Sequence, residues 1–152
     1  MVPAFVGLGA PHWDPEARGA IFGLTLDATG AHLARAALEA TAYQTRDLIA
    51  AMVGDGCAQP AAIRVDGGMT ANSWLCQFLA DIVGVPVDRP ANLETTALGA
   101  AFHAGLATGV WSGLDELSRT WSAADTFRPH MDADLRGRLI DGWDRAVAKT
   151  LT

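Results

Sequence analysis

The middle of the chain alternates between short apolar segments that suit β-strands and a longer segment with helical periodicity. Residues 62–65 and 85–87 are the two apolar runs, and residues 71–83 between them carry apolar side chains at helical spacing. A strand, a helix and a strand in this order form a βαβ unit. The sequence therefore predicts an α/β domain, with helices packed on a mostly parallel sheet.

Apolar spacing predicts three further helices, at residues 33–52, 97–106 and 135–147. Gly54 and Gly56 end the first, because glycine readily adopts the left-handed conformation that follows a helix. Asp132 precedes the last helix, where a carboxylate is favourable at the positive end of the helix dipole. The remaining stretches, 2–24 and 111–129, are expected to be loops and connections, with one strand candidate at residues 20–24.

Composition excludes several classes of function. The chain has 152 residues, half of them apolar, and a net charge of -6 without a basic cluster, which disfavours nucleic-acid binding. No apolar run approaches the roughly 20 residues that span a bilayer, and no signal peptide is evident, so we expect a cytoplasmic chain.

Cys57 and Cys76 are expected to be reduced thiols. The four histidines lack metal-ligand spacing, and His32 at a helix start favours capping.

The segment from Ile63 to Asn72 is the strongest candidate for a ligand site. A buried strand runs into Asp66, Gly67 and Gly68 and then directly into a helix, in whose first turn Asn72 is expected. Glycine lets a ligand lie against the backbone, and a helix start offers free N–H groups to polar or anionic oxygens. Many such glycine pairs are only tight turns, so this pattern alone leaves both interpretations open.

A longer pattern supports the ligand interpretation. Gly19-Ala20-Ile21-Phe22-Gly23-Leu24, a seven-residue spacer and residues 32–39 together resemble the signature of the FGGY carbohydrate kinases. Within that family, further ordered segments resemble the glycerol kinase branch. These are residues 2–5, 7–14, 17–19, 43–47, 65–72 and 95–101.

The resemblance implies an ATP-dependent kinase of two domains, each with the ribonuclease-H-like fold of the actin, sugar kinase and Hsp70 superfamily. Residues 1–152 are similar to the carboxy-terminal domain, incomplete at its amino-terminal side. By this resemblance Gly68 contacts the adenosine nucleotide through its backbone and Asn72 through its side chain, with Asp66 and Gly67 as supporting residues. ATP is the implied cofactor, and Mg²⁺ would be carried by the nucleotide, since no protein ligand for it is identified.

The resemblance also implies parts that these 152 residues do not contain. The amino-terminal kinase domain carries the catalytic Asp and the glycerol site, so we identify no catalytic residue here and expect little phosphoryl transfer from this chain alone. Three interpretations stay open: a glycerol kinase contributing part of its ATP site, a non-catalytic fragment or half of a split kinase, and another FGGY sugar kinase. Uncovered sheet edges predict association, either with copies of itself or with an amino-terminal half.

Overall fold

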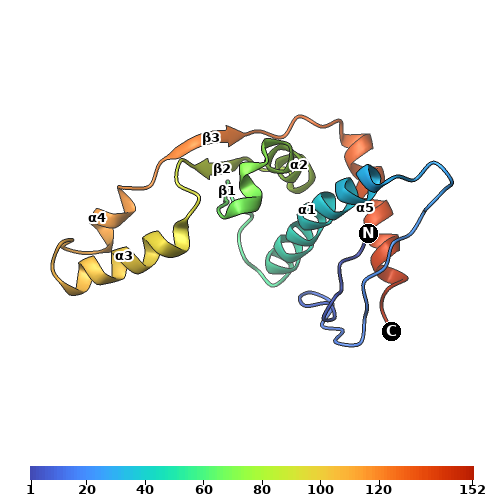
Figure 1. Cartoon of the computed structure of the whole chain (residues 1–152), viewed down its shortest axis with the longest axis horizontal. Helices are drawn as coiled ribbons and strands as arrows, with labels where there is room; N and C mark the ends of the chain where they lie inside the picture. The colour runs from blue at the N-terminus through green and yellow to red at the C-terminus, as the bar shows by residue number, and fades with distance from the viewer.

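The computed structural model describes all residues, 1–152, as an α/β assembly of helices around a small sheet (Figure 1). The elements in chain order are α1 (Gly30–Gly54), β1 (Ile63–Arg64), the 3₁₀ helix η1 (Gly68–Ala71), α2 (Ser73–Val83), β2 (Val87–Pro90), α3 (Thr95–Ala107), α4 (Leu114–Ser118), β3 (Ala123–Phe127) and α5 (Ala133–Ala148). The predicted βαβ unit is confirmed as β1, α2 and β2, and the three flanking helices are confirmed as α1, α3 and α5.

The sheet has three strands in the order β1-β2-β3. β1 and β2 are parallel, with Ile63 opposite Val87, whereas β2 and β3 are antiparallel, with Val87 opposite Phe127. The sheet is therefore mixed rather than mostly parallel. The predicted connection over residues 111–129 was wrong because it contains both α4 and β3. Four of the five β3 residues are exposed, so this strand carries no apolar alternation and is defined by its pairing with β2.

The strand predicted at residues 20–24 does not form. Only Ala20 pairs, in an antiparallel bridge with Val2 whose two N–H···O distances are 2.8 and 3.0 Å. Residues 21–24 are exposed and no strand lies beside them. A strand needs a neighbour for its backbone groups, so apolar composition by itself was not sufficient.

Helix ends follow local chemistry. The backbone N–H of Thr29 donates to Nδ1 of His32 at 3.1 Å, which confirms the capping role expected for His32. α2 ends at Gly84, whose φ of 81° is in the left-handed region that favours glycine. The guanidinium of Arg136 lies over Gly84 and donates to the carbonyls of Ile82 and Val83, at 2.9 and 3.2 Å. α5 thus supplies partners for the carbonyls at the end of α2.

The core forms around α2, eight of whose eleven residues are buried. α1 packs along it, and an aromatic cluster joins α1, α2 and α5. The Tyr43 ring meets Phe78 edge-on at a centroid distance of 5.7 Å and stacks on Trp143 at 5.3 Å. Burial raises the pKa of the Tyr43 hydroxyl, with a further contribution from Glu39. These aromatic contacts fix the two long helices against the central one.

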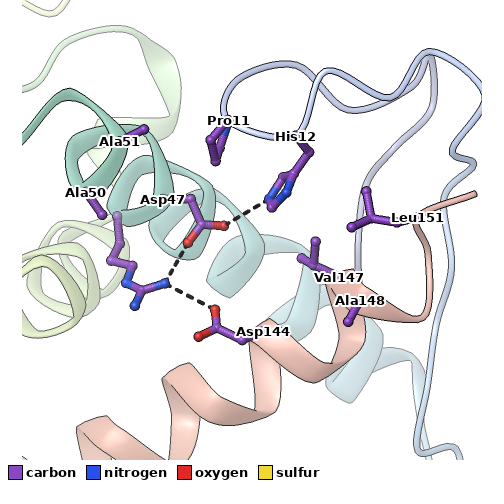
Figure 2. Close-up of a pocket in the computed structure, with 10 residues that line it drawn as sticks. Pro11, His12, Asp47, Ala50, Ala51, Asp144, Val147, Ala148 and Leu151 are labelled. Carbon is purple, nitrogen blue, oxygen red and sulfur yellow. Dashed lines mark hydrogen bonds and ion pairs between the residues drawn. The ribbon is translucent and has the colours of Figure 1, made fainter. Parts of the chain in front are cut away.

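A buried carboxylate, Asp47, joins α1 to α5 (Figure 2). Its Oδ2 accepts a hydrogen bond from the indole N–H of Trp143 at 2.6 Å, and its Oδ1 accepts one from Arg46 at 2.8 Å. Arg46 also donates to Asp144 at 3.1 Å, and Nε2 of His12 lies 3.8 Å from Asp47 Oδ2. Asp47 is therefore stabilised by polar partners from α1 and α5, and the loop that carries His12 lies beside it.

Residues 95–118, here called the α3 arm, extend away from this core (Figure 1). α3 is mostly apolar, yet its only buried residue is Gly105, which packs against the Trp111 ring. Phe102 meets the same ring edge-on at 5.2 Å. The extensive contacts between elements all lie among α1, α2, α5, η1 and the strands. The arm is thus held together internally but packs little against the core.

We expect replacement of Trp143 by Phe to destabilise the fold by about 1.5–3 kcal/mol. The change keeps an aromatic ring but removes the N–H that Asp47 accepts, and a lost hydrogen bond to a buried charge costs this much. Urea unfolding followed by circular dichroism would measure the effect. The matched control is Asp144→Asn, which alters a half-exposed partner of Arg46 and should cost less than about 1 kcal/mol. Equal costs for the two variants would contradict the role given to Asp47.

We expect the two thiols to react very differently with Ellman's reagent. Cys57 is exposed, whereas Cys76 is buried in α2, and burial raises the pKa of the Cys76 thiol. The thiolate is the reactive species. In the native chain the reagent should therefore modify Cys57 quickly, and it should modify Cys76 only when the chain unfolds. In the Cys57→Ser variant the fast reaction should disappear. Rapid reaction of both thiols in the folded chain would be inconsistent with the packing of α2.

Candidate functional site

The candidate ligand site is the turn between β1 and α2, residues 66–72, here called the glycine turn. Gly67 has φ 82° and ψ 168°, a conformation open essentially to glycine alone, and Gly68 begins η1. A Cβ atom added at Gly67 or at Gly68 would meet no atom within 4 Å. The outer surface of the turn is therefore open, as a backbone that contacts a ligand closely requires.

The second half of the glycine turn is fixed by β2 and α2. The Thr70 hydroxyl donates to the Gly67 carbonyl at 2.7 Å. Arg89 of β2 donates to the carbonyl oxygens of Thr70 and Ala71 at 2.8 and 3.3 Å. The Cys76 thiol donates to the Thr70 carbonyl at 3.3 Å. These bonds hold the backbone of residues 70 and 71 in one orientation.

Arg89 is itself oriented by β3, the strand that was not predicted from the sequence. Its guanidinium donates to Asp125 Oδ2 of β3 at 2.8 Å through Nη2 and at 3.2 Å through Nε. The Arg89 side chain also lies over the Phe127 ring, 5.1 Å from the centroid. β3 thus reaches the glycine turn indirectly, through Arg89.

The first half of the glycine turn is bonded to the segment that enters α3. The Gly67 N–H donates to the Leu93 carbonyl at 3.1 Å, and the Thr95 hydroxyl donates to Oδ2 of Asp66. Thr95 is the first residue of α3. The structure brings Thr95 and Arg89 to the turn that contains Asp66, Gly67 and Gly68, and their distance along the chain gave no sequence signal.

Asn72 lies one position before the place expected for it. It is the N-cap of α2 rather than a residue of the first helical turn, because the 3₁₀ turn of η1 precedes it. Its side-chain Oδ1 accepts a hydrogen bond from the Leu75 N–H at 3.2 Å. The exposed amide nitrogen of Asn72 has no hydrogen-bond partner in the structure, so one polar group remains available to a ligand.

The glycine turn offers backbone groups, the free amide of Asn72 and the Asp66 carboxylate, which accepts the hydrogen bond from Thr95. No group of three or more His, Cys, Asp or Glu side chains could hold a metal ion. A cavity of about 330 Å³ lies elsewhere, between the His12 loop, α1 and α5 (Figure 2). The glycine turn is thus an open edge of the domain, on which a ligand would lie.

None of the helices combines the length and the apolar character that crossing a membrane requires.

Comparison with known proteins identifies the family. Residues 1–108 match the model of the C-terminal domain of the FGGY family of carbohydrate kinases. The whole chain is 58% identical to the glycerol kinase of Gluconobacter oxydans, of which it covers 30%. The chain therefore spans about 30% of the length of the curated relatives that it matches.

Solved structures agree with this match. A glycerol kinase from Plasmodium falciparum, determined with ADP, superposes with a TM-score of 0.83 at 37% identity, over 99% of this chain and 30% of that one. A xylulose kinase from Rhodospirillum rubrum gives a TM-score of 0.76 at 30% identity, over 97% of this chain and 30% of its own. The expected fold class, part of the α/β C-terminal domain of this kinase superfamily, is confirmed.

The family match, the identity along the full chain and the shared fold lead to one conclusion. This chain belongs to the FGGY family of carbohydrate kinases and corresponds to part of the family's C-terminal domain.

Proposed function

We propose that this chain forms part of the nucleotide side of an ATP-dependent carbohydrate kinase. The observation that carries the proposal is the open glycine turn, which combines free space at Gly67 and Gly68 with the free amide of Asn72. The solved relative from Plasmodium falciparum carries ADP, which supports an adenine nucleotide as the ligand. In this proposal Gly68 contacts the nucleotide through its backbone and Asn72 through its side chain, with Asp66 and Gly67 in support.

The proposed acceptor is glycerol. Relatives at 55–58% identity over essentially the whole chain are glycerol kinases. The xylulose kinase structures are 23–30% identical, below the 37% of the Plasmodium falciparum glycerol kinase. Both comparisons favour glycerol over a pentulose as the substrate of the complete enzyme.

The proposed reaction moves the γ-phosphoryl group of ATP to a hydroxyl oxygen of glycerol, which gives ADP and glycerol 3-phosphate. Mg²⁺ would be carried by the nucleotide phosphates, and no residue of this chain is assigned to it. Phosphoryl transfer depends on holding nucleophile, metal and γ-phosphate in one cleft. The residues described here supply the nucleotide edge alone, so the base and the glycerol site belong to the rest of the kinase, whether on the same polypeptide or on a second one.

The Asn72→Ser variant tests the role of the Asn72 side chain. Serine keeps an oxygen that can cap α2, so stability should change little, but it removes the free amide. We expect ATP affinity, measured by titration calorimetry with and without Mg²⁺, to fall about tenfold, which corresponds to 1.4 kcal/mol.

Asn72→Ala is the matched control, because it removes the cap as well as the amide. It should weaken ATP binding to a similar degree and also destabilise α2 by about 0.5–2 kcal/mol. GTP titrations would report selectivity for the base. ATP binding by the wild-type chain that is unaffected by either substitution would remove Asn72 from the nucleotide site.

The two glycines should respond differently to alanine. Gly68 lacks a positive φ and its added Cβ meets open space, so Gly68→Ala should fold normally yet lower ATP affinity about tenfold by occupying the ligand's place. Gly67→Ala should instead destabilise the fold by about 1–3 kcal/mol, because its backbone conformation is closed to alanine. Thermal unfolding and calorimetry on both variants separate the effects. Unchanged ATP affinity in Gly68→Ala would place the ligand elsewhere.

A further inference from the structure

The α3 arm is joined to the rest of the molecule at the glycine turn. Thr95 donates to Asp66 across 29 positions of sequence, and no other hydrogen bond or ion pair joins residues 95–118 to the sheet or to α1, α2 or α5. α3 also lacks extensive packing against those elements. The orientation of the arm relative to the core is therefore set at its two connections to the chain and at this one bond.

The Thr95–Asp66 bond restrains residues 66 and 67, the part of the glycine turn that has no hydrogen bond to β2 or α2. β2 and α2 bond to residues 70 and 71. Residues 66 and 67 make tertiary hydrogen bonds only with Thr95, which donates to Asp66, and with Leu93, whose carbonyl accepts from Gly67. Leu93 lies two positions before Thr95, so both bonds come from one short segment. The positive-φ conformation of Gly67 has no side chain to hold it. These bonds restrain it from outside the turn, in addition to the local bonds that its carbonyl accepts from Thr70.

We propose that Thr95 is a positioning residue for the nucleotide turn, acting through Asp66. Its hydroxyl holds the Asp66 carboxylate, which fixes the backbone that leads into Gly67 and Gly68, and it thereby couples the orientation of the α3 arm to the geometry of the turn. Thr95 does not contact the nucleotide in this scheme. The inference rests on the proposed function for its consequence on ATP binding, but the restraint on the turn can be tested without nucleotide.

The chain offers a matched pair of variants for this test. Thr95→Val removes the hydroxyl and keeps the shape of the side chain. Thr96→Val makes the same change one residue later, on an exposed hydroxyl without a hydrogen bond. Thr95→Ser restores the hydroxyl and should restore the wild-type behaviour. Thermal unfolding of each variant establishes that the core is intact before the turn is compared.

The first measurement is amide hydrogen exchange of residues 67–71 in the nucleotide-free chain. We expect exchange in this segment to be about tenfold faster in Thr95→Val, because the variant loses the hydrogen bond that joins Asp66 to α3. Thr96→Val and Thr95→Ser should match the wild type. Unchanged exchange in Thr95→Val would overturn the inference.

The second measurement is ATP affinity of the same variants by calorimetry. Weaker binding in Thr95→Val alone, restored in Thr95→Ser, supports the positioning role. Faster exchange with unchanged ATP affinity would overturn it, since the turn would then be loosened without consequence for the ligand. A third outcome is that exchange is faster in Thr95→Val but the wild-type chain does not bind ATP at all. This result would contradict the proposed function and leave the restraint on the turn supported.

Discussion

The structure depends on burying most of α2. Eight of the eleven α2 residues are buried, and α1, α5 and the sheet each cover part of it. The neighbouring elements must therefore supply partners for the polar groups of α2 that are buried. The contacts of Asp81 show how this is achieved. Its Oδ1 accepts hydrogen bonds from the backbone N–H groups of His130 and Met131, at 2.7 and 3.1 Å.

The same requirement positions both ends of α2. At the carboxyl end, Arg136 of α5 bonds to the last carbonyls, and at the amino end Asn72 caps the helix while Cys76 bonds to Thr70. The candidate ligand turn is therefore attached to the most buried helix of the molecule. Residues 70 and 71 of the turn are bonded to that helix and to β2, whereas residues 66 and 67 are bonded to the segment that enters the α3 arm, which packs little against the core. Binding elements placed on a rigid scaffold but linked to a less tightly packed segment are suited to adjust around a ligand.

The core of the fold is built around α2, from side chains of α1, α2, α5 and the strands. A phosphoryl-transfer site is different, because the nucleophile and the nucleotide must be held opposite each other. In the proposed function, the glycine turn would provide one side of such an arrangement, with an open surface at Gly67 and Gly68 and a free amide at Asn72.

Features that depend on neighbours along the chain could be predicted from the sequence. Helical spacing located α1, α2, α3 and α5, and Gly54 and Gly56 lie where α1 ends, as predicted. The strand followed by Gly67 and Gly68 could also be predicted, because a turn with positive φ requires glycine.

Features that depend on partners far along the chain became evident only in the folded structure. The segment at residues 20–24 has strand composition but no neighbour, whereas β3 has little strand character and pairs with β2. The Thr95–Asp66 bond and the contacts of Arg89 at the turn join residues 18 to 36 positions apart. Periodicity reports which residues are buried locally, but which segments meet is decided by how the whole core packs.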